Sequence, residues 1–176
     1  MSKLLIIASV FALAVPAAFA AQPSGQAAQA TTPSASELCK QQRRTIGMAA
    51  FRALYAPTGT PKAAMDACLS SQKSIVGIAA KNAAMECKAE QAQDAAAFAV
   101  RYGKNENDKN ALGKCVSAKA QQSVEQQQQA TLNAAKKCKA ERAQGAEAFA
   151  NKYGTNKNKR NAFGKCVSKL AKEQSD

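Results

Sequence analysis

The sequence predicts an all-α protein built from tandem helix-loop-helix repeats, each closed by a disulfide bond, after a cleaved signal peptide and a flexible linker. A stretch of 33 residues, Cys87–Lys119, recurs without gaps at Cys138–Leu170 with 21 identical positions. Six cysteines fall into three pairs separated by 29, 28 and 28 positions. Ala, Gln, Lys and Glu, all good helix formers, dominate the repeated segments, and no alternation typical of strands occurs.

Residues 1–20 have the three parts of a bacterial-type secretory signal peptide. Lys3 supplies a short positive segment, 4–15 is an apolar run, and Ala18 and Ala20 are the small residues that signal peptidase requires. A bilayer span needs ~20 apolar residues, so a retained membrane anchor or a buried N-terminal helix is the less favoured alternative. Cleavage after Ala20 would give a secreted or periplasmic protein.

Residues 21–36 are uncharged and rich in Ala, Gln, Pro, Ser and Thr, which predicts a flexible linker rather than an ordered loop packed on the body. The whole chain has 25 Lys and Arg against 12 Asp and Glu, a net charge of +13. Loss of Lys3 with the signal peptide would leave +12. An anionic partner is therefore one interpretation, and a charged surface that only aids solubility is the other.

Three repeats follow the linker, at residues 37–72, 83–119 and 136–172. The second and third share a Phe eleven residues after the first Cys, a Tyr-Gly pair, an Asn-rich loop and a Gly-Lys-Cys-Val-Ser segment. The first is a diverged copy, as terminal copies of repeat arrays often are. Residues 120–135 are rich in Gln but lack Gly and Pro, which predicts a helical connector that makes one long helix. A flexible Gln-rich linker is the alternative.

In an exported chain, six cysteines indicate disulfides rather than a metal site, because His and closely spaced Cys ligands are missing. Fifteen pairings are possible, and the repeat favours Cys39–Cys68, Cys87–Cys115 and Cys138–Cys166. In a plain hairpin Cys87 and Cys115 would be offset by ~13 Å along the helix axis. We therefore expect the Asn-rich loop to fold back in extended form. A competing Cys115–Cys138 bond would have to span ~35 Å of continuous helix.

The sequence of each unit predicts a helix, a loop and a second helix. Apolar positions from Cys87 to Tyr102 recur at three- or four-residue spacing, which predicts one continuous first helix. The corresponding face of the third unit includes Arg142. Gly103 and Gly154 follow the last apolar residue, where a left-handed C-cap is favoured.

The second helices carry a glycine in both copies, Gly113 and Gly164, which predicts a close approach of another helix. The Asn-rich loop precedes them, and Asn is a good N-cap. The Asn positions are shared by both loops while the charges reverse, with Asp108 in the second unit and Lys159 in the third. This pattern favours a structural role for Asn and argues against a calcium site.

The sequence contains no recognisable catalytic set, since the chain has no His to serve as general base or to activate a nucleophile. Acid pairs such as Glu86 and Glu90 are interpreted as a solvated helical surface. We expect a non-enzymatic protein with no cofactor, no metal and no small-molecule substrate.

The strongest candidate site is a cluster of basic residues in the third unit. It lies near a helix N-terminus, where positive charge is unfavourable, and this placement suggests an anionic partner. We expect binding to anionic envelope or extracellular polymers or to a membrane surface. The alternative is a structural or protein–protein interaction role, with another copy or another exported protein as partner. The candidate anion-binding residues are Lys157, Lys159, Arg160 and Lys165.

Overall fold

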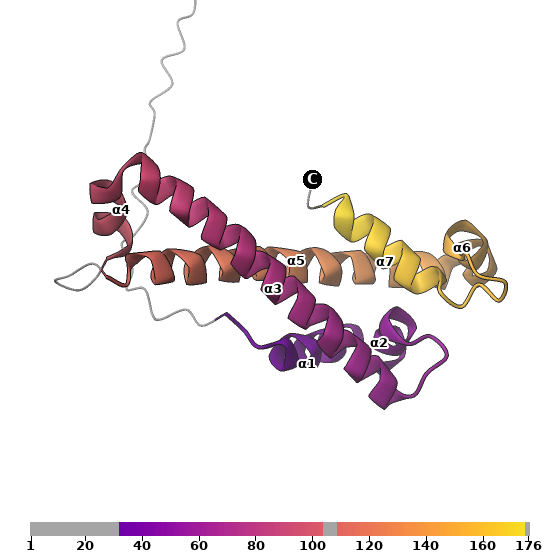
Figure 1. The fold of residues 1–176 in the computed structure, drawn as a ribbon. Coiled ribbons are helices and arrows are strands. Elements are labelled where there is room, and N and C mark those ends of the chain that lie inside the picture. The colour runs from indigo at the N-terminus through magenta and orange to yellow at the C-terminus, as the bar shows by residue number, and fades with distance from the viewer. Residues whose placement is uncertain (1–31, 104–108, 175–176) are drawn as a thin grey trace, which may run out of the picture.

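The computed structural model describes residues 32–103 and 109–174. The predicted signal peptide lies outside the described residues, as does most of the predicted linker and the centre of the second Asn-rich loop. The described part of the chain forms seven helices and no strand, which confirms the all-α prediction (Figure 1). Among the described helices, none combines the length and the apolarity needed to cross a membrane.

The first unit begins with α1 (Ala35–Ile46) and α2 (Met48–Tyr55). Helix α1 starts within the last residues of the predicted linker because Ser34 and Glu37 form a capping box: the Ser34 hydroxyl accepts a bond from the Glu37 N–H at 3.2 Å, and the Glu37 carboxylate accepts one from the Ser34 N–H at 2.9 Å. Gly47 separates the two helices with a φ of 82°, a conformation that favours glycine.

Two long helices connect the units. Helix α3 (Pro61–Gln93) and helix α5 (Ala111–Gln144) each provide the second helix of one unit and the first helix of the next. Thr60 caps α3, with Pro61 at its first position. The connector segment 120–135 lies inside α5, and its Gln and Ala residues sustain the helix there without a Gly or Pro break.

The prediction of one continuous helix from Cys87 to Tyr102 is wrong. In each unit the chain turns sharply a few residues before the Phe that all three units share. Helix α3 ends at Gln93 and a new short helix, α4 (Ala95–Tyr102), starts directly. Asp94 stabilises the new start by accepting a bond from the Ala97 N–H at 2.9 Å. In the third unit the same break at Gly145 precedes α6 (Ala146–Tyr153), which is followed by α7 (Ala162–Lys172).

This break resolves the geometric difficulty with the disulfides. The short helices turn away from the axes of the long ones (Figure 1), so the offset is absorbed at the turn and does not depend on an extended loop alone. The three disulfides then join Cys39 to Cys68, Cys87 to Cys115 and Cys138 to Cys166, each with Cα atoms 6.0 Å apart. Beside each disulfide lies a Phe–Tyr ring pair, with centroids 5.0, 4.9 and 4.9 Å apart.

The first and third units share one hydrophobic core. Phe51 and Cys68 of the first unit belong to the same buried cluster as Phe149, Phe163 and Val167 of the third. A smaller cluster around Val124 lies where α3 and α5 pack together, and the second unit has a small core of its own around Phe98. The chain is thus a hairpin of two long helices with the second unit at one end and the other two units at the opposite end (Figure 1).

Candidate anion-binding site

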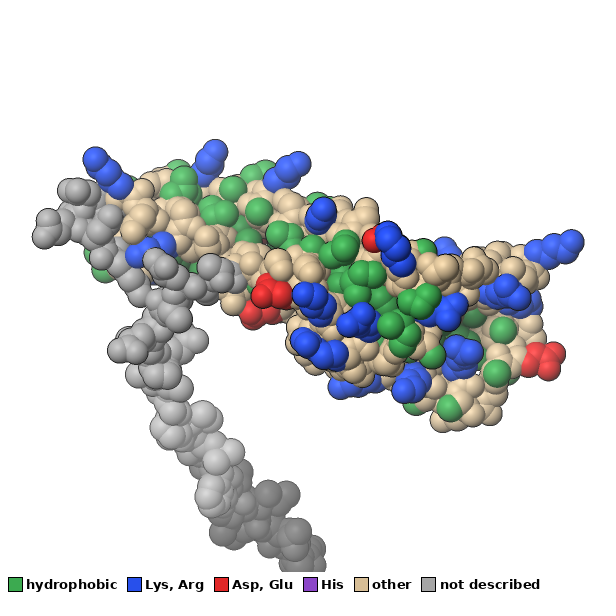
Figure 2. Space-filling view, turned by 90° about the horizontal axis from the view of Figure 1, so that it is seen from below, with side chains coloured by type: hydrophobic (Ala, Val, Ile, Leu, Met, Phe, Trp, Pro, Cys, Tyr) green, Lys and Arg blue, Asp and Glu red, His purple; other side chains and the backbone are tan. Residues whose placement is uncertain are grey.

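Packing of the first unit on the third gathers most of the net charge at one end of the molecule. Residues 136–172 contain eleven Lys and Arg against two Glu, and residues 37–72 contain five against two. The second unit, 83–119, is nearly balanced, with six against five. We call the first and third units together the basic end. Figure 2 shows a face of the molecule on which Lys and Arg side chains far outnumber acidic ones.

The four predicted candidate residues lie in or just after the loop that joins α6 to α7. Lys157, Arg160 and Lys165 are exposed, and Lys159 is half-buried. Only Lys159 and Arg160 reach a common cavity. Lys157 and Lys165 are not among the residues that line it.

The cavity has a volume of about 330 Å³ and lies between the first and third units. Arg142, near the end of α5, is its third cation; the sequence placed this residue on the inward face of the unit but did not mark it as a candidate. Phe149 and Phe163 provide aromatic surface, and no Asp or Glu is among the lining residues in the described part of the chain. The lining residues are Ala53, Pro57, Arg142, Ala146, Phe149, Ala150, Asn158, Lys159, Arg160, Ala162 and Phe163.

Asn side chains hold the basic loop in shape. Asn161 accepts a bond from the Thr155 N–H at 3.1 Å and donates to the Thr155 hydroxyl at 2.7 Å. Asn158 accepts a bond from the Arg160 N–H at 3.2 Å. The structural role expected for Asn in this loop is thus present, but Asn161 makes no side-chain cap on α7 because its amide is engaged by the loop.

Gly154 positions Lys159, although not through the left-handed cap expected from the sequence. Its φ is −74°, and that of Gly103 is −70°, so both glycines are extended. A Cβ at Gly154 would lie 2.5 Å from the Ala150 carbonyl oxygen and 2.6 Å from the Lys159 Cβ. Glycine is needed at position 154 because the loop folds back and brings Lys159 close to its Cα. Lys159 itself has a φ of 52° and donates to the Asn151 side chain.

The glycines of the second helices differ between the copies. A Cβ at Gly164 would lie 3.3 Å from the Leu54 carbonyl oxygen of α2, so the close helix approach predicted there is confirmed. A Cβ at Gly113 would meet no atom of the described residues within 4 Å, so the same prediction is wrong for the second unit. The difference arises because only the third unit packs against the first.

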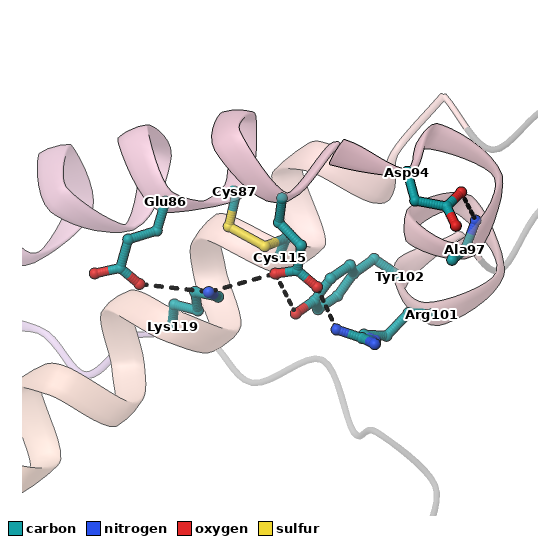
Figure 3. A network of polar contacts seen from close by, with 9 residues as sticks. Glu86, Cys87, Asp94, Ala97, Arg101, Tyr102, Cys115 and Lys119 are labelled. Atoms are coloured by element: carbon teal, nitrogen blue, oxygen red, sulfur yellow. Dashed lines mark hydrogen bonds and ion pairs between the residues drawn. A yellow bond between two sulfur atoms is a disulfide. The ribbon is translucent and has the colours of Figure 1, made fainter. Parts of the chain in front are cut away.

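The interpretation of Glu86 and Glu90 as a solvated helical surface is right for Glu86, whose side chain is 61% exposed, but incomplete for Glu90, which is 23% exposed and held by structural contacts. Glu90 receives a hydrogen bond from the Tyr102 hydroxyl at 3.3 Å and pairs with Arg101 and, at 3.4 Å, with Lys119. Lys119 also reaches Glu86 at 3.4 Å, beside the Cys87–Cys115 disulfide (Figure 3). Burial tends to raise the pKa of Glu90, but the Lys119 bond and the Arg101 charge outweigh it and hold that pKa below its usual value.

The third unit repeats this arrangement with Glu141. Its carboxylate accepts bonds from Lys152 at 2.8 Å and from the Tyr153 hydroxyl at 3.0 Å. The Lys152 bond is the main cause of the lowered pKa of Glu141. Both acids of this type are therefore occupied by structural partners, and they do not neutralise the cations that line the cavity.

In the first unit an amide replaces the acid. Gln42 occupies the position three residues after the first Cys, is fully buried, and accepts a bond from the Tyr55 hydroxyl. It donates to the side chain of Gln128 at 2.7 Å, which in turn donates to the Leu38 carbonyl at 3.3 Å. Leu54 stands where the other copies have a cation before the Tyr. This neutral network ties α1 and α2 to α5, and the sequence alone gave no sign of it.

Comparison of the chain with protein-family models, with curated proteins and with solved structures finds no match. The geometry of the basic end therefore provides the basis for a functional assignment.

Proposed function

We propose that this protein is an exported, non-enzymatic tandem-repeat protein, freed from its signal peptide after Ala20, that binds anionic envelope or extracellular polymers through its basic end. The observation that carries the proposal is the packing of the first unit on the third. It places sixteen Lys and Arg and only four acids in the segments 37–72 and 136–172 at one end of the molecule. Like charges held together repel one another, and a polyanion relieves this repulsion while releasing its counterions.

Most cations of the basic end carry no ion pair in the described part of the chain, the exceptions being Lys62 and Lys152. Among the described residues, the acids that form ion pairs engage Lys62, Arg101, Lys119 and Lys152, and none pairs with a candidate residue or with Arg142. Asn161 and Gly154 fix the shape of the loop that carries Lys157, Lys159 and Arg160, so these cations are held in a defined arrangement.

The disulfides support export. All six cysteines are fully buried and paired, so the fold depends on bonds that persist in an oxidising compartment. Such a compartment, outside the cytoplasm, is also where envelope polymers are encountered.

The test is binding of the oxidised protein to heparin, to long-chain polyphosphate and to vesicles of anionic lipid across a salt series. The test variant combines Lys157→Ala, Lys159→Ala and Arg160→Ala. The matched control removes the same charge elsewhere, through Lys81→Ala, Lys88→Ala and Lys109→Ala, all at exposed positions outside the basic end.

We expect log K to fall linearly with log salt, and the test variant to reduce the slope by up to about 2–3 because each phosphate contact contributes ~0.7–0.9. The control should change the slope much less. Binding that does not depend on salt, or equal losses in the two variants, would refute the proposal.

A protein partner is the second candidate function, favoured by apolar side chains away from the basic loop. Ile78 and Met85 on α3 are 57% and 65% exposed, and Val100 on α4 is 85% exposed. Light scattering over a concentration series tests self-association through this surface. A mass that stays at the monomer value, for the wild type and for Ile78→Ser with Met85→Ser alike, would exclude a second copy as the partner.

A further inference from the structure

We propose that the cavity between the first and third units is a specific binding site for a phosphomonoester group that carries an apolar substituent. This inference rests on the proposed function, since it names the chemical group of the anionic partner that the basic end selects. It differs from general polyanion binding because it requires a defined cavity rather than a charged surface.

The charge of the cavity matches a dianion. Arg142, Lys159 and Arg160 line it without any lining carboxylate in the described part of the chain. Two guanidinium groups offer paired N–H donors that fit the oxygens of a phosphate, and Lys159, whose ammonium also donates to the Asn151 side chain, adds a third positive group. A phosphomonoester carries close to two negative charges at neutral pH, so it uses three cations better than a monocarboxylate does.

The rest of the lining selects what is attached to the phosphate. Phe149 and Phe163 are 3% exposed each, and what remains of their surface contributes to the wall of the cavity together with Ala53 and Pro57 of the first unit. A volume of about 330 Å³ is at the lower end of the range typical of small-ligand sites. The cavity therefore has room for a phosphate and a small apolar group, such as a ring or the first carbons of an acyl chain.

Comparison of the two matching copies shows that two of the three lining cations are particular to the third unit, while Arg160 has a cationic counterpart in Lys109. Where the third unit has Arg142 and Lys159, the second unit has Gln91 and Asp108 at the aligned positions. The fold of the unit thus does not require these cations. The third unit is also the one that packs against the first, whose Ala53 and Pro57 complete the cavity. The unit that has these additional cations is therefore also the unit whose cavity is closed by the first unit.

The test measures binding of phenyl phosphate, inorganic phosphate and phenol to the oxidised protein by calorimetry and by the NMR shifts of the Phe149 and Phe163 rings. We expect phenyl phosphate to bind about tenfold more tightly than inorganic phosphate because its ring contacts the apolar wall, and phenol to bind weakly. Dihexanoyl phosphatidic acid and glucose 6-phosphate then distinguish a lipid source from a sugar-phosphate polymer, and the apolar wall predicts the lipid as the tighter ligand.

Two variants with the same charge change locate the site. Arg142→Gln with Lys159→Asp gives the third unit the residues of the second, and Lys169→Gln with Lys172→Asp makes the same change on exposed positions farther along α7. The first pair should weaken phenyl phosphate at least tenfold, and the second less than threefold.

Equal affinity for phenyl phosphate and inorganic phosphate, or equal losses in the two variants, would overturn the inference. Unshifted Phe149 and Phe163 resonances in the wild-type protein would overturn it without recourse to any variant. If heparin or polyphosphate still binds in a salt-dependent way when one of these results is obtained, the proposed function holds and only the phosphomonoester site in the cavity is refuted.

Discussion

Substitution of the two equivalent glycines by alanine tests the packing of the first unit on the third. Gly113 and Gly164 occupy the third position of their helices in the same Gly-Lys-Cys-Val-Ser context. Alanine is favoured over glycine in a helix by ~1 kcal/mol. Local propensity by itself would therefore predict similar stabilisation at both positions.

The tertiary structure predicts opposite signs. Within the described part of the chain a Cβ at Gly113 meets nothing within 4 Å, so Gly113→Ala should raise the free energy of unfolding by ~0.5–1 kcal/mol. A Cβ at Gly164 would lie 3.3 Å from the Leu54 carbonyl oxygen and 3.9 Å from that of Ala53. These are backbone atoms of α2, which cannot rotate away, and overpacking of this kind costs ~1–3 kcal/mol. Gly164→Ala should therefore be destabilising by ~1 kcal/mol.

The assay is denaturant and thermal unfolding of the oxidised variants, in which 1 kcal/mol corresponds to a shift in Tm of about 2–4 °C for a chain of this size. Gly77→Ala in the middle of α3 is a further control, because a Cβ there also meets no atom of residues 32–103 and 109–174 within 4 Å. It should stabilise like Gly113→Ala. Equal stabilisation by Gly164→Ala and Gly113→Ala would refute the close contact between α7 and α2, and with it the shared core of the basic end.

Three further predictions concern a disulfide, a buried amide and a partly exposed ion pair. Replacing Cys138 and Cys166 together by Ala should lower the free energy of unfolding by ~3–4 kcal/mol, the loop-closure term for a bond of this span; an unchanged denaturation midpoint would contradict this. Gln42→Glu should destabilise the protein by ~3 kcal/mol at neutral pH because it buries a carboxylate without a cation beside it. The loss of stability should shrink in acid, where the carboxylate is protonated. A loss that does not vary with pH would show that the buried charge is not its cause. The pKa of Glu141 is lowered below 4.5, chiefly by the hydrogen bond from Lys152, so its contribution is present above the ordinary glutamate pKa and disappears as the pH falls below 4.5. Stability of Glu141→Gln should accordingly vary less with pH in acid than that of the wild type, and parallel pH profiles would show that the pair contributes nothing.

The helical secondary structure and the cysteine pairing were predictable from the sequence, but the path of the chain within a unit was not. Helix propensity and the repeat spacing are local properties, so they predicted the helical connector at residues 120–135. The break at Asp94 was missed because the apolar spacing from Cys87 to Tyr102 continues through it, and only a capping hydrogen bond to the Ala97 N–H marks the turn. A Gly at the aligned position of the third unit, Gly145, was the signal that could have shown it.

The candidate site was predicted in part. The loop cations Lys159 and Arg160 were identified from charge alone, because basic residues that are close together in the sequence can be recognised without a structure. Arg142 was missed as a site residue because it lies many residues away and reaches the same cavity only through the turn at Gly145. The contribution of Ala53 and Pro57 could not be foreseen, since no sequence pattern says which distant unit packs on the third.

The sequence by itself determined what each unit is: a pair of helix-forming segments with a fixed cysteine spacing, an aromatic pair, and a net positive charge concentrated in the last copy. These features follow from the chain's own periodicity and composition. Only the tertiary structure decided where the units lie. Helices α3 and α5 fold back as a hairpin and bury the first unit against the third. Because of this packing, Gly113 and Gly164 have different surroundings although they occupy equivalent positions in the repeat, and the cations of the third unit lie beside an apolar wall. That arrangement depends on burial of apolar surface between segments about a hundred residues apart, which local pattern cannot encode.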